Sequence, residues 1–98
     1  MKTFKDIQFH QSMGGNLKSI TRFDNGFELS VIAGEFAYST PRESNEDPDF
    51  FSEFEIAIFN DDGEFVTKDF LPGHDDDVLG WQNRGQINAL MLLIQSKK

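Results

Sequence analysis

Residues 23–33 read FDNGFELSVIA, and this stretch decides the fold that the sequence predicts. From residue 27 to residue 33 every odd-numbered residue is apolar and shares one face, while Glu28, Ser30 and Ile32 share the other, which is the pattern of a half-buried β-strand. The Asp-Asn-Gly sequence at residues 24–26 predicts a tight turn, because Asn and Gly tolerate positive φ. With an apolar segment at residues 17–23 before it, this stretch predicts a β-hairpin. A continuation of the strand through residues 36–38 stays open.

A second hairpin is predicted further along the chain. Residues 50–59 read FFSEFEIAIF and again alternate. Residues 60–63, Asn-Asp-Asp-Gly, predict the turn, and residues 64–70 are the expected partner strand. The polar stretch at residues 40–49 has a proline near each end and predicts a loop. In addition, residues 3–9 are predicted as a short edge strand, and Gly14-Gly15-Asn16 predicts another turn.

The C-terminal segment predicts a helix. Asn83 and Gln86 have the spacing of a capping box. An apolar stripe then follows at i, i+3, i+4 and i+7. It consists of Ile87, Leu90, Met91 and Ile94. Lys97 and Lys98 fall where the helix dipole favours cations. Leu92 lies outside the stripe and is either a single exposed leucine or a contact for a partner subunit.

Together these patterns predict one domain over residues 1–98, of the α+β class. We expect an antiparallel β-sheet of about four strands, formed by two hairpins and packed against one C-terminal helix. Eleven Phe residues supply large side chains for a small core. With no Cys, disulfides and thiolate chemistry are excluded. The longest apolar run, residues 89–94, is far too short to span a membrane, and no signal segment is evident, so we expect a soluble cytoplasmic protein.

The net charge of −8 comes from one segment. Residues 43–77 hold thirteen carboxylates and a single basic residue, Lys68, while the remainder is neutral or mildly basic. One interpretation is that this charge keeps the protein soluble and protects edge strands. The other is a binding face for a basic protein, in which carboxylates steer the partner and aromatic side chains anchor it. The candidate protein-binding residues are Glu46, Asp47, Asp49, Phe51, Glu53, Glu55, Phe59, Asp61, Asp62, Glu64, Asp75, Asp76 and Asp77.

The sharpest form of this prediction concerns the 50–70 hairpin. Its face away from the core is expected to be the acidic surface, with Phe51 and Phe59 beside Glu53 and Glu55. Whether this face binds a partner or only keeps the protein soluble depends on the two phenylalanines. Direct binding of nucleic acid is disfavoured, because it needs Lys and Arg to neutralise phosphates.

Catalytic, metal and cofactor sites are not predicted. Residues 60–63 resemble part of an EF-hand loop, but the first ligand position is apolar and the flanks are strands, so a hairpin turn is favoured. His74 and the aspartates at 75–77 are consecutive on one loop, and side chains of consecutive residues rarely bind the same ion, so a solvated acidic loop is favoured. Asp76 or Asp77 is also a possible cap for a short turn at residues 78–81. The serines and histidines show no nucleophile or base motif, so we expect no enzyme.

Several segments resemble small bacteriophage and prophage proteins of unassigned function. They are MKTFKDIQF at the start, FDNGFELSVI, EIAIF, and DDVLGWQ and INALMLLIQ before the end. The resemblance implies a phage accessory protein in the cytoplasm of a bacterial host, a class that includes inhibitors of host defence such as anti-CRISPR proteins.

The expected function follows from the resemblance and the charge together. We expect a small non-enzymatic accessory protein that binds and inhibits a basic, nucleic-acid-binding host protein through its acidic surface in residues 43–77. The alternative is a structural or assembly protein that self-associates, for example as a homodimer, through an edge strand or the C-terminal helix.

Overall fold

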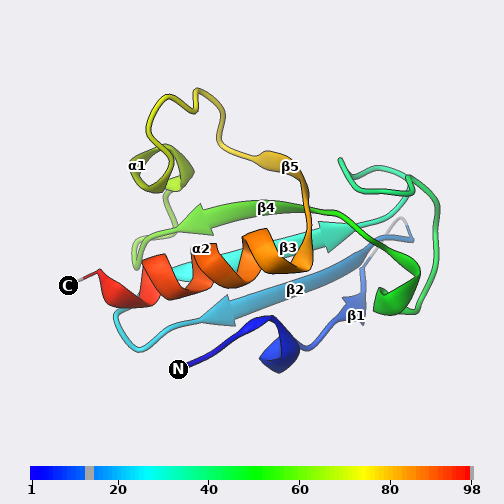
Figure 1. The fold of residues 1–98 in the computed structure, drawn as a ribbon, viewed down its shortest axis with the longest axis horizontal. Helices are drawn as coiled ribbons and strands as arrows, with labels where there is room; N and C mark the ends of the chain where they lie inside the picture. The colour runs from blue at the N-terminus through cyan, green and yellow to red at the C-terminus, as the bar shows by residue number, and fades with distance from the viewer. Residues whose placement is uncertain (13–14, 98) are drawn as a thin grey trace.

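A computed structural model describes residues 1–12 and 15–97 and shows an antiparallel sheet of five strands with one long helix across it (Figure 1). The α+β prediction is confirmed, with five strands where about four were expected. The sheet order follows the chain order. The strands are β1 (His10–Gln11), β2 (Leu17–Arg22), β3 (Glu28–Ala33), β4 (Phe54–Phe59) and β5 (Leu79–Gln82). The helices are α1 (Thr67–Phe70) and α2 (Arg84–Ser96), with 3₁₀ turns at Phe4–Asp6 and Pro48–Phe50.

The hairpin predicted around residues 24–26 is confirmed as β2 and β3. Ile20 lies opposite Ser30 in the antiparallel register. Gly26 closes the turn with φ of 92° and donates its N–H to the Phe23 carbonyl at 3.0 Å, while the Phe23 N–H bonds to the Phe27 carbonyl at 2.8 Å. A turn followed by a residue of positive φ matches the right-handed twist of the two strands.

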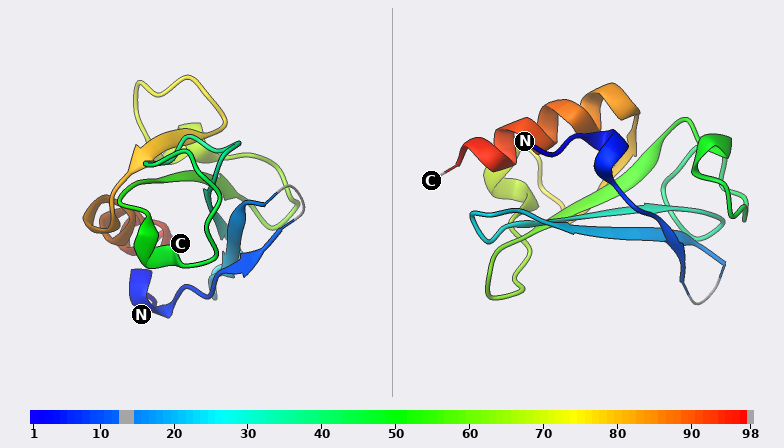
Figure 2. Two further views of the ribbon diagram at one scale, coloured as in Figure 1. Left: turned by 90° about the vertical axis from the view of Figure 1, so that its right-hand side faces the viewer. Right: turned by 90° about the horizontal axis from the view of Figure 1, so that it is seen from below.

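The core lies between the sheet and α2, which form two layers (Figure 2, right). On the sheet side, the predicted alternation buries Leu29, Val31 and Ala33 of β3 beside Phe54, Ile56 and Ile58 of β4. From α2, the predicted stripe is buried in full: Ile87, Leu90, Met91 and Ile94. Each apolar side chain that leaves water here contributes roughly 1.5–3 kcal/mol, so this contact is the main source of stability.

The predicted capping box starts α2. The Gln86 N–H donates to Asn83 Oδ1 at 2.8 Å, and the Asn83 N–H donates to Gln86 Oε1 at 2.9 Å. These two bonds satisfy backbone donors that a helix N-terminus otherwise leaves unpaired. Of the two lysines predicted at the other end, Lys97 is the C-cap residue and Lys98 lies outside the described residues.

The prediction of a second hairpin is correct for its turn and wrong for the partner strand after the turn. The turn itself is confirmed, since the Gly63 N–H donates to the Asn60 carbonyl at 3.1 Å. However, residues 64–70 form no strand: Phe65 makes one bridge to Phe59, and the chain then enters α1. The reason is that the Thr67 hydroxyl accepts the Ile58 N–H at 2.9 Å and so takes the place of a partner strand. The strand that pairs with β4 instead is β5, where only a short turn was expected.

The N-terminal prediction is also wrong. Residues 3–9 contain a 3₁₀ turn, closed by the Thr3 N–H donating to Asp6 Oδ2 at 2.8 Å, and the edge strand is β1. That backbone hydrogen bond lowers the pKa of Asp6 below its ordinary value. A turn was also predicted at residues 14–16, of which Gly14 lies outside the described residues. On either side of it, the Ser12 N–H donates to the Asn16 carbonyl at 2.8 Å.

The open continuation of β3 through residues 36–38 does not occur. The strand ends at Ala33, because Gly34 has φ of 150°. A Cβ at Gly34 would lie 2.2 Å from Asn16 Oδ1, so only glycine fits where the chain leaves the sheet.

Asn25 joins the first hairpin to the end of α2. Its Nδ2 donates to the carbonyls of Ile94 at 2.8 Å and Lys97 at 2.9 Å, at the C-terminal end of the helix. We expect Asn25→Asp to lower the free energy of unfolding by about 1–2 kcal/mol, since it removes the donor and places a negative charge at the negative end of the helix dipole. Urea denaturation checks this. Asn25→Ala, which removes the donor without adding charge, should lose less; equal stability of Asn25→Asp and the native protein would contradict the role of Asn25.

Candidate protein-binding surface

The carboxylates of residues 43–77 do not form one face. Glu53 and Glu55 lie at the start of β4, and the 60–63 turn lies beyond its other end (Figure 1). Four residues of strand, from Glu55 to Phe59, already separate them by about 13 Å. The aspartates at 75–77 belong to the loop between α1 and β5. The predicted acidic surface is therefore distributed over several parts of the molecule.

At the start of β4 the carboxylates are bonded within the protein. Glu55 Oε1 accepts the Tyr38 N–H at 3.1 Å, and Glu53 Oε1 accepts the Thr40 hydroxyl at 2.7 Å. Both bonds hold the segment that follows β3 against β4. These two glutamates thus position Tyr38 and Thr40 in addition to carrying charge.

The 60–63 turn holds its own group of carboxylates. Asp61 pairs with Arg22 of β2, and Glu28 lies 3.5 Å from the same guanidinium. The hydrogen bond with Asp61 raises the pKa of Arg22 above its ordinary value. Asp62 and Glu64 are exposed beside them, and Glu64 accepts the Asn60 side-chain amide at 2.9 Å. This end of the sheet therefore keeps a negative balance after its one arginine is paired.

The 3₁₀ turn Pro48–Phe50 uses two of the candidate residues. Asp47 Oδ1 accepts the Asp49 N–H at 3.0 Å and so caps the turn. Asp49 Oδ1 lies 3.7 Å from the Arg84 guanidinium at the start of α2. Glu46 is exposed just before the turn. Local structure explains the positions of Asp47 and Asp49.

The loop before β5 carries the last acidic group. Asp75, Asp76 and Asp77 are all exposed. Asp77 Oδ1 lies 3.8 Å from Lys68 Nζ, and the Asp77 carbonyl accepts the Thr67 hydroxyl at 2.6 Å. In the part of the chain that the structure describes, no three His, Asp or Glu side chains are grouped so as to hold a metal ion.

The prediction that Phe51 is exposed beside the acidic residues is wrong. Phe51 is only 1% exposed, and its ring lies 6.2 Å from that of Phe54. The cause is the 3₁₀ turn at Pro48–Phe50: the strand begins at Phe54, so the alternation assumed from residue 50 does not apply. Phe59 is half-buried and packs at 4.6 Å against Phe65, which is exposed.

The sheet face opposite α2, here called the outer face, is apolar at its centre. Across the strands Ile20, Ser30 and Ala57 form one row by the register of β2, β3 and β4. The neighbouring rows add charges of both signs. The outer-face residues are Lys18, Ile20, Arg22, Glu28, Ser30, Ile32, Glu55, Ala57 and Phe59. With two basic and two acidic side chains, this face is not the acidic surface that the alternation predicts.

An exposed aromatic pair borders the outer face at β5. The rings of Tyr38 and Trp81 lie 5.2 Å apart and are 43% and 51% exposed as residues. The Arg42 guanidinium lies 5.4 Å from the Tyr38 ring centroid. Gly80 makes the contact possible, because a Cβ there would lie 2.6 Å from Tyr38 Cβ. The Trp81–Tyr38 pair was not found from the sequence, where the only signal was that Trp81 is the single tryptophan.

The backbone of Trp81 is strained, and its side chain is exposed. Its φ is +54°, the left-handed region, which costs a residue with a Cβ roughly 1–2 kcal/mol. In this conformation the Trp81 N–H donates to the Tyr38 carbonyl at 2.9 Å. Strain of this kind is concentrated at functional sites in proteins.

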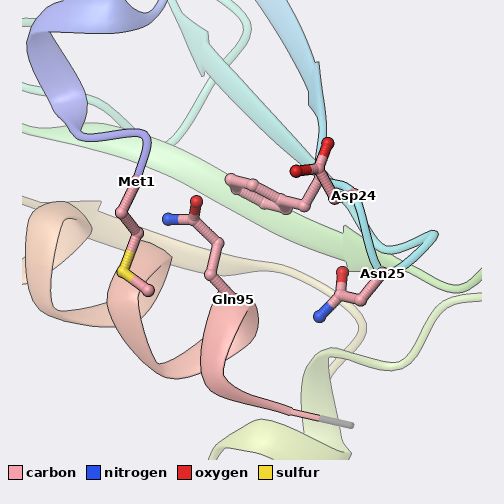
Figure 3. A pocket seen from close by; sticks show the side chains of 5 residues that line it. Met1, Asp24, Asn25 and Gln95 are labelled. Carbon is pink, nitrogen blue, oxygen red and sulfur yellow. The ribbon is translucent and has the colours of Figure 1, made fainter.

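A small cleft lies between the N-terminus, the 24–26 turn and the end of α2 (Figure 3). Its volume is about 260 Å³, and its lining is Met1, Phe23, Asp24, Asn25 and Gln95. The side-chain amides of Asn25 and Gln95 are already hydrogen-bonded within the protein. Asn25 Nδ2 donates to the Ile94 carbonyl, and Gln95 bonds to the backbone N–H and carbonyl of Lys2 at 2.9 Å and 2.8 Å. Asp24 supplies the one side-chain carboxylate of this lining.

The surface thus offers two features with chemistry suited to binding. One is the Trp81–Tyr38 pair at the border of the outer face, and the other is the excess of carboxylates around the sheet. None of the helices described in residues 1–12 and 15–97 is long and apolar enough to cross a membrane. Comparisons with protein-family models, curated proteins and solved structures find no match for this chain.

Proposed function

We propose that this chain is a small non-enzymatic accessory protein of phage type, which binds and inhibits a basic, nucleic-acid-binding host protein. The Trp81–Tyr38 pair is the anchor, and the carboxylates attract the partner. The observation that carries the proposal is the display of Trp81 in a strained backbone conformation, with its ring tilted against that of Tyr38 and the Arg42 guanidinium over the Tyr38 ring. Trp, Tyr and Arg are the residue types most enriched in the energetic centres of protein interfaces.

Electrostatics support a basic partner. The chain carries a net charge of −8, and carboxylates at residues 62, 64, 75 and 76 are exposed in the two segments before and after α1. A field of this kind raises the rate of encounter with a basic surface, while close contacts fix the orientation. A host protein that binds nucleic acid presents such a surface, and occupation by a polyanionic protein would block it.

The outer face of the sheet adds further apolar side chains to the surface that the Trp81–Tyr38 pair offers to a partner. Ile20 of its central row is exposed, and the Phe59–Phe65 pair lies at the other end of β4. An apolar centre with polar and charged residues around it is the usual composition of a protein interface. In this proposal the acidic residues act as the rim, and the apolar contacts provide most of the affinity.

The test is the affinity of the Trp81→Ala variant. A host partner is captured from bacterial lysate at low salt, purified, and its binding is measured by calorimetry. We expect Trp81→Ala to weaken binding by roughly 30-fold or more, because truncation of an anchor costs about 2 kcal/mol or more. Phe50→Ala, which truncates another half-exposed aromatic that is not part of the pair, is the matched control and should change the affinity less than about twofold.

Salt and charge reversal test the electrostatic part separately. We expect the captured partner to dissociate as salt is raised, and Asp62→Lys combined with Glu64→Lys to slow its association. An unchanged affinity of Trp81→Ala would refute the anchor. Failure to retain any basic protein at low salt would refute the function as a whole.

Self-association is the second candidate function, and one observation favours its helix route. Leu92 and Leu93 are 45% and 48% exposed on α2. The edge-strand route is less favoured, because β1 has only two residues and β5 is irregular where it pairs with β4. A concentration-dependent mass in analytical ultracentrifugation would support self-association, and a constant monomer mass would exclude it.

A further inference from the structure

The exposed side of α2 is unusual for a surface helix because it has no charge. The twelve residues from 85 to 96 include no Asp, Glu, Lys or Arg, in a chain of which 27% is charged. Ala89, Leu92 and Leu93 of this segment are exposed. Loss of charged residues from a surface is the compositional mark of the centre of an interface.

A groove runs along one side of this helix. Its volume is about 300 Å³, and it is here called the α2 groove. Its lining residues are Leu71, Leu79, Gln82, Gln86, Ala89, Leu90 and Leu93. Beyond Leu93 the surface continues into a second hollow beside Phe70 and Pro72. Leu93 lines both hollows and is therefore the central apolar side chain of the groove.

The lining of the α2 groove is uncharged, and the loop on one side of the groove is acidic. One side is the 85–96 segment of α2, which contains no charged residue. The other is formed by Leu71 and Leu79, the two ends of the loop drawn in yellow between α1 and β5 (Figure 1). That loop carries Asp75, Asp76 and Asp77, all exposed, with Lys68 beside Asp77 alone. An occupant is therefore expected to be apolar where it enters the groove and basic on the side that meets the loop.

The geometry favours a helix over an added strand. From Gln86 to Ser96 the groove and the second hollow together follow eleven residues of α2, or about 15 Å, which matches three turns of a bound helix. Strand addition would need free backbone groups on β5. However, the Trp81 N–H is bonded to the Tyr38 carbonyl at 2.9 Å, and the Gly80 carbonyl accepts the Gln82 side-chain amide at 3.0 Å.

We infer that the α2 groove binds an amphipathic α-helix of a partner protein. Its apolar side chains, spaced at i, i+3 or i+4, and i+7, pack against Leu79, Ala89 and Leu93, and its basic residues face the aspartates at 75–77. Neither Trp81 nor Tyr38 lines this groove, so the inference can be tested independently of the proposed anchor.

A designed peptide tests the inference directly. The probe is a fluorescent peptide of about 14 residues with leucines at helical spacing on one face and lysines on the flank, long enough to cover the groove. A peptide of the same composition in scrambled order is its control. We expect the full-length protein to bind the amphipathic peptide and not the scrambled one, as measured by fluorescence anisotropy.

Two neighbouring leucines provide the matched variants. Leu93 lines the groove and Leu92 does not, although both are about half exposed on the same helix. We expect Leu93→Ser to weaken peptide binding roughly fivefold or more and Leu92→Ser to leave it within twofold. Because both side chains are exposed, both variants should fold, which circular dichroism checks.

A double variant tests the contribution of the acidic loop beside the groove. Asp75→Asn with Asp76→Asn should weaken binding and reduce its dependence on salt. Absence of binding to the native protein, or equal losses for Leu92→Ser and Leu93→Ser, would overturn the inference. So would a dimer in analytical ultracentrifugation that Leu93→Ser dissociates, because the groove would then be filled by a second copy of the chain.

Discussion

Replacement of Phe51 by alanine should lower the free energy of unfolding by about 3–5 kcal/mol, the usual loss for a large buried aromatic side chain. The Phe51 ring is 1% exposed and packs against the rings of Phe54 at 6.2 Å and Phe50 at 5.3 Å. Truncation leaves a cavity that the surrounding side chains only partly fill. Urea denaturation followed by circular dichroism measures the loss, which is a large part of the 5–15 kcal/mol typical of a domain.

The adjacent Phe50 gives the matched control. It is the same residue type, next in the chain, but half exposed. Phe50→Ala should therefore cost well under half as much as Phe51→Ala, since less apolar surface returns to water. Similar losses for the two variants would contradict the burial of Phe51. The comparison also separates the two roles considered for Phe51, because a binding residue on the surface would affect affinity and leave stability nearly unchanged.

Arg84→Ala should cost about 2–4 kcal/mol. The guanidinium donates to the carbonyls of Phe51 at 2.8 Å and Pro48 at 2.9 Å, and hydrogen bonds to charged groups contribute about 1.5–3 kcal/mol each, with the lower value expected for a half-buried group such as Arg84. It also lies 5.3 Å and 5.2 Å from the ring centroids of Phe4 and Phe54. One side chain thus joins the N-terminal segment, the 48–51 segment and β4 to the start of α2. The loss is measured by the same urea titration.

Two further variants show which of these contacts matters. Asp49→Ala removes only the exposed ion pair with Arg84 and should change stability by less than about 0.5 kcal/mol. Arg84→Lys keeps the charge but loses the planar fork that reaches two carbonyls, so it should recover only part of the loss. Full recovery by lysine would show that charge alone is needed and would contradict the proposed geometry.

The elements that could be predicted from the sequence are those encoded over a few neighbouring residues. The 24–26 turn has the side chains that its conformation requires, and Leu29, Val31 and Ala33 of β3 recur at every second residue on the core face. The capping box and the apolar stripe of α2 are equally local. In each case propensity, pattern and tertiary packing agree, so the prediction and the structure coincide.

The failed predictions share a different cause. Whether residues 64–70 pair with β4 depends on the Thr67 hydroxyl, which bonds to Ile58 and to the Asp77 carbonyl and so links three segments. The pairing of β5 with β4 likewise joins parts of the chain that no local pattern connects. Side-chain bonds of this kind compete with strand pairing and leave no periodic signal.

The candidate site was predictable in its charge and not in its location. The excess of carboxylates is a property of composition and survives in the structure. Its distribution depends on where each segment packs, and the Phe51 prediction failed because the strand starts later than the alternation suggests. The Trp81–Tyr38 pair joins residues on separate segments through Gly80 and a backbone bond, which only the three-dimensional structure reveals.

The order of the strands in the sheet also bears on how the chain folds. Each strand pairs with its neighbours in the sequence, so the sheet can assemble by successive closure of loops, starting from the short β2–β3 connection. The longest of these closures is the 20-residue segment between β3 and β4, residues 34–53. By contrast, α2 bonds to Phe4 through Asn88 and to the 24–26 turn through Asn25. Its docking therefore requires distant parts of the chain to be in place, and α2 is expected to consolidate last, after the transition state for folding.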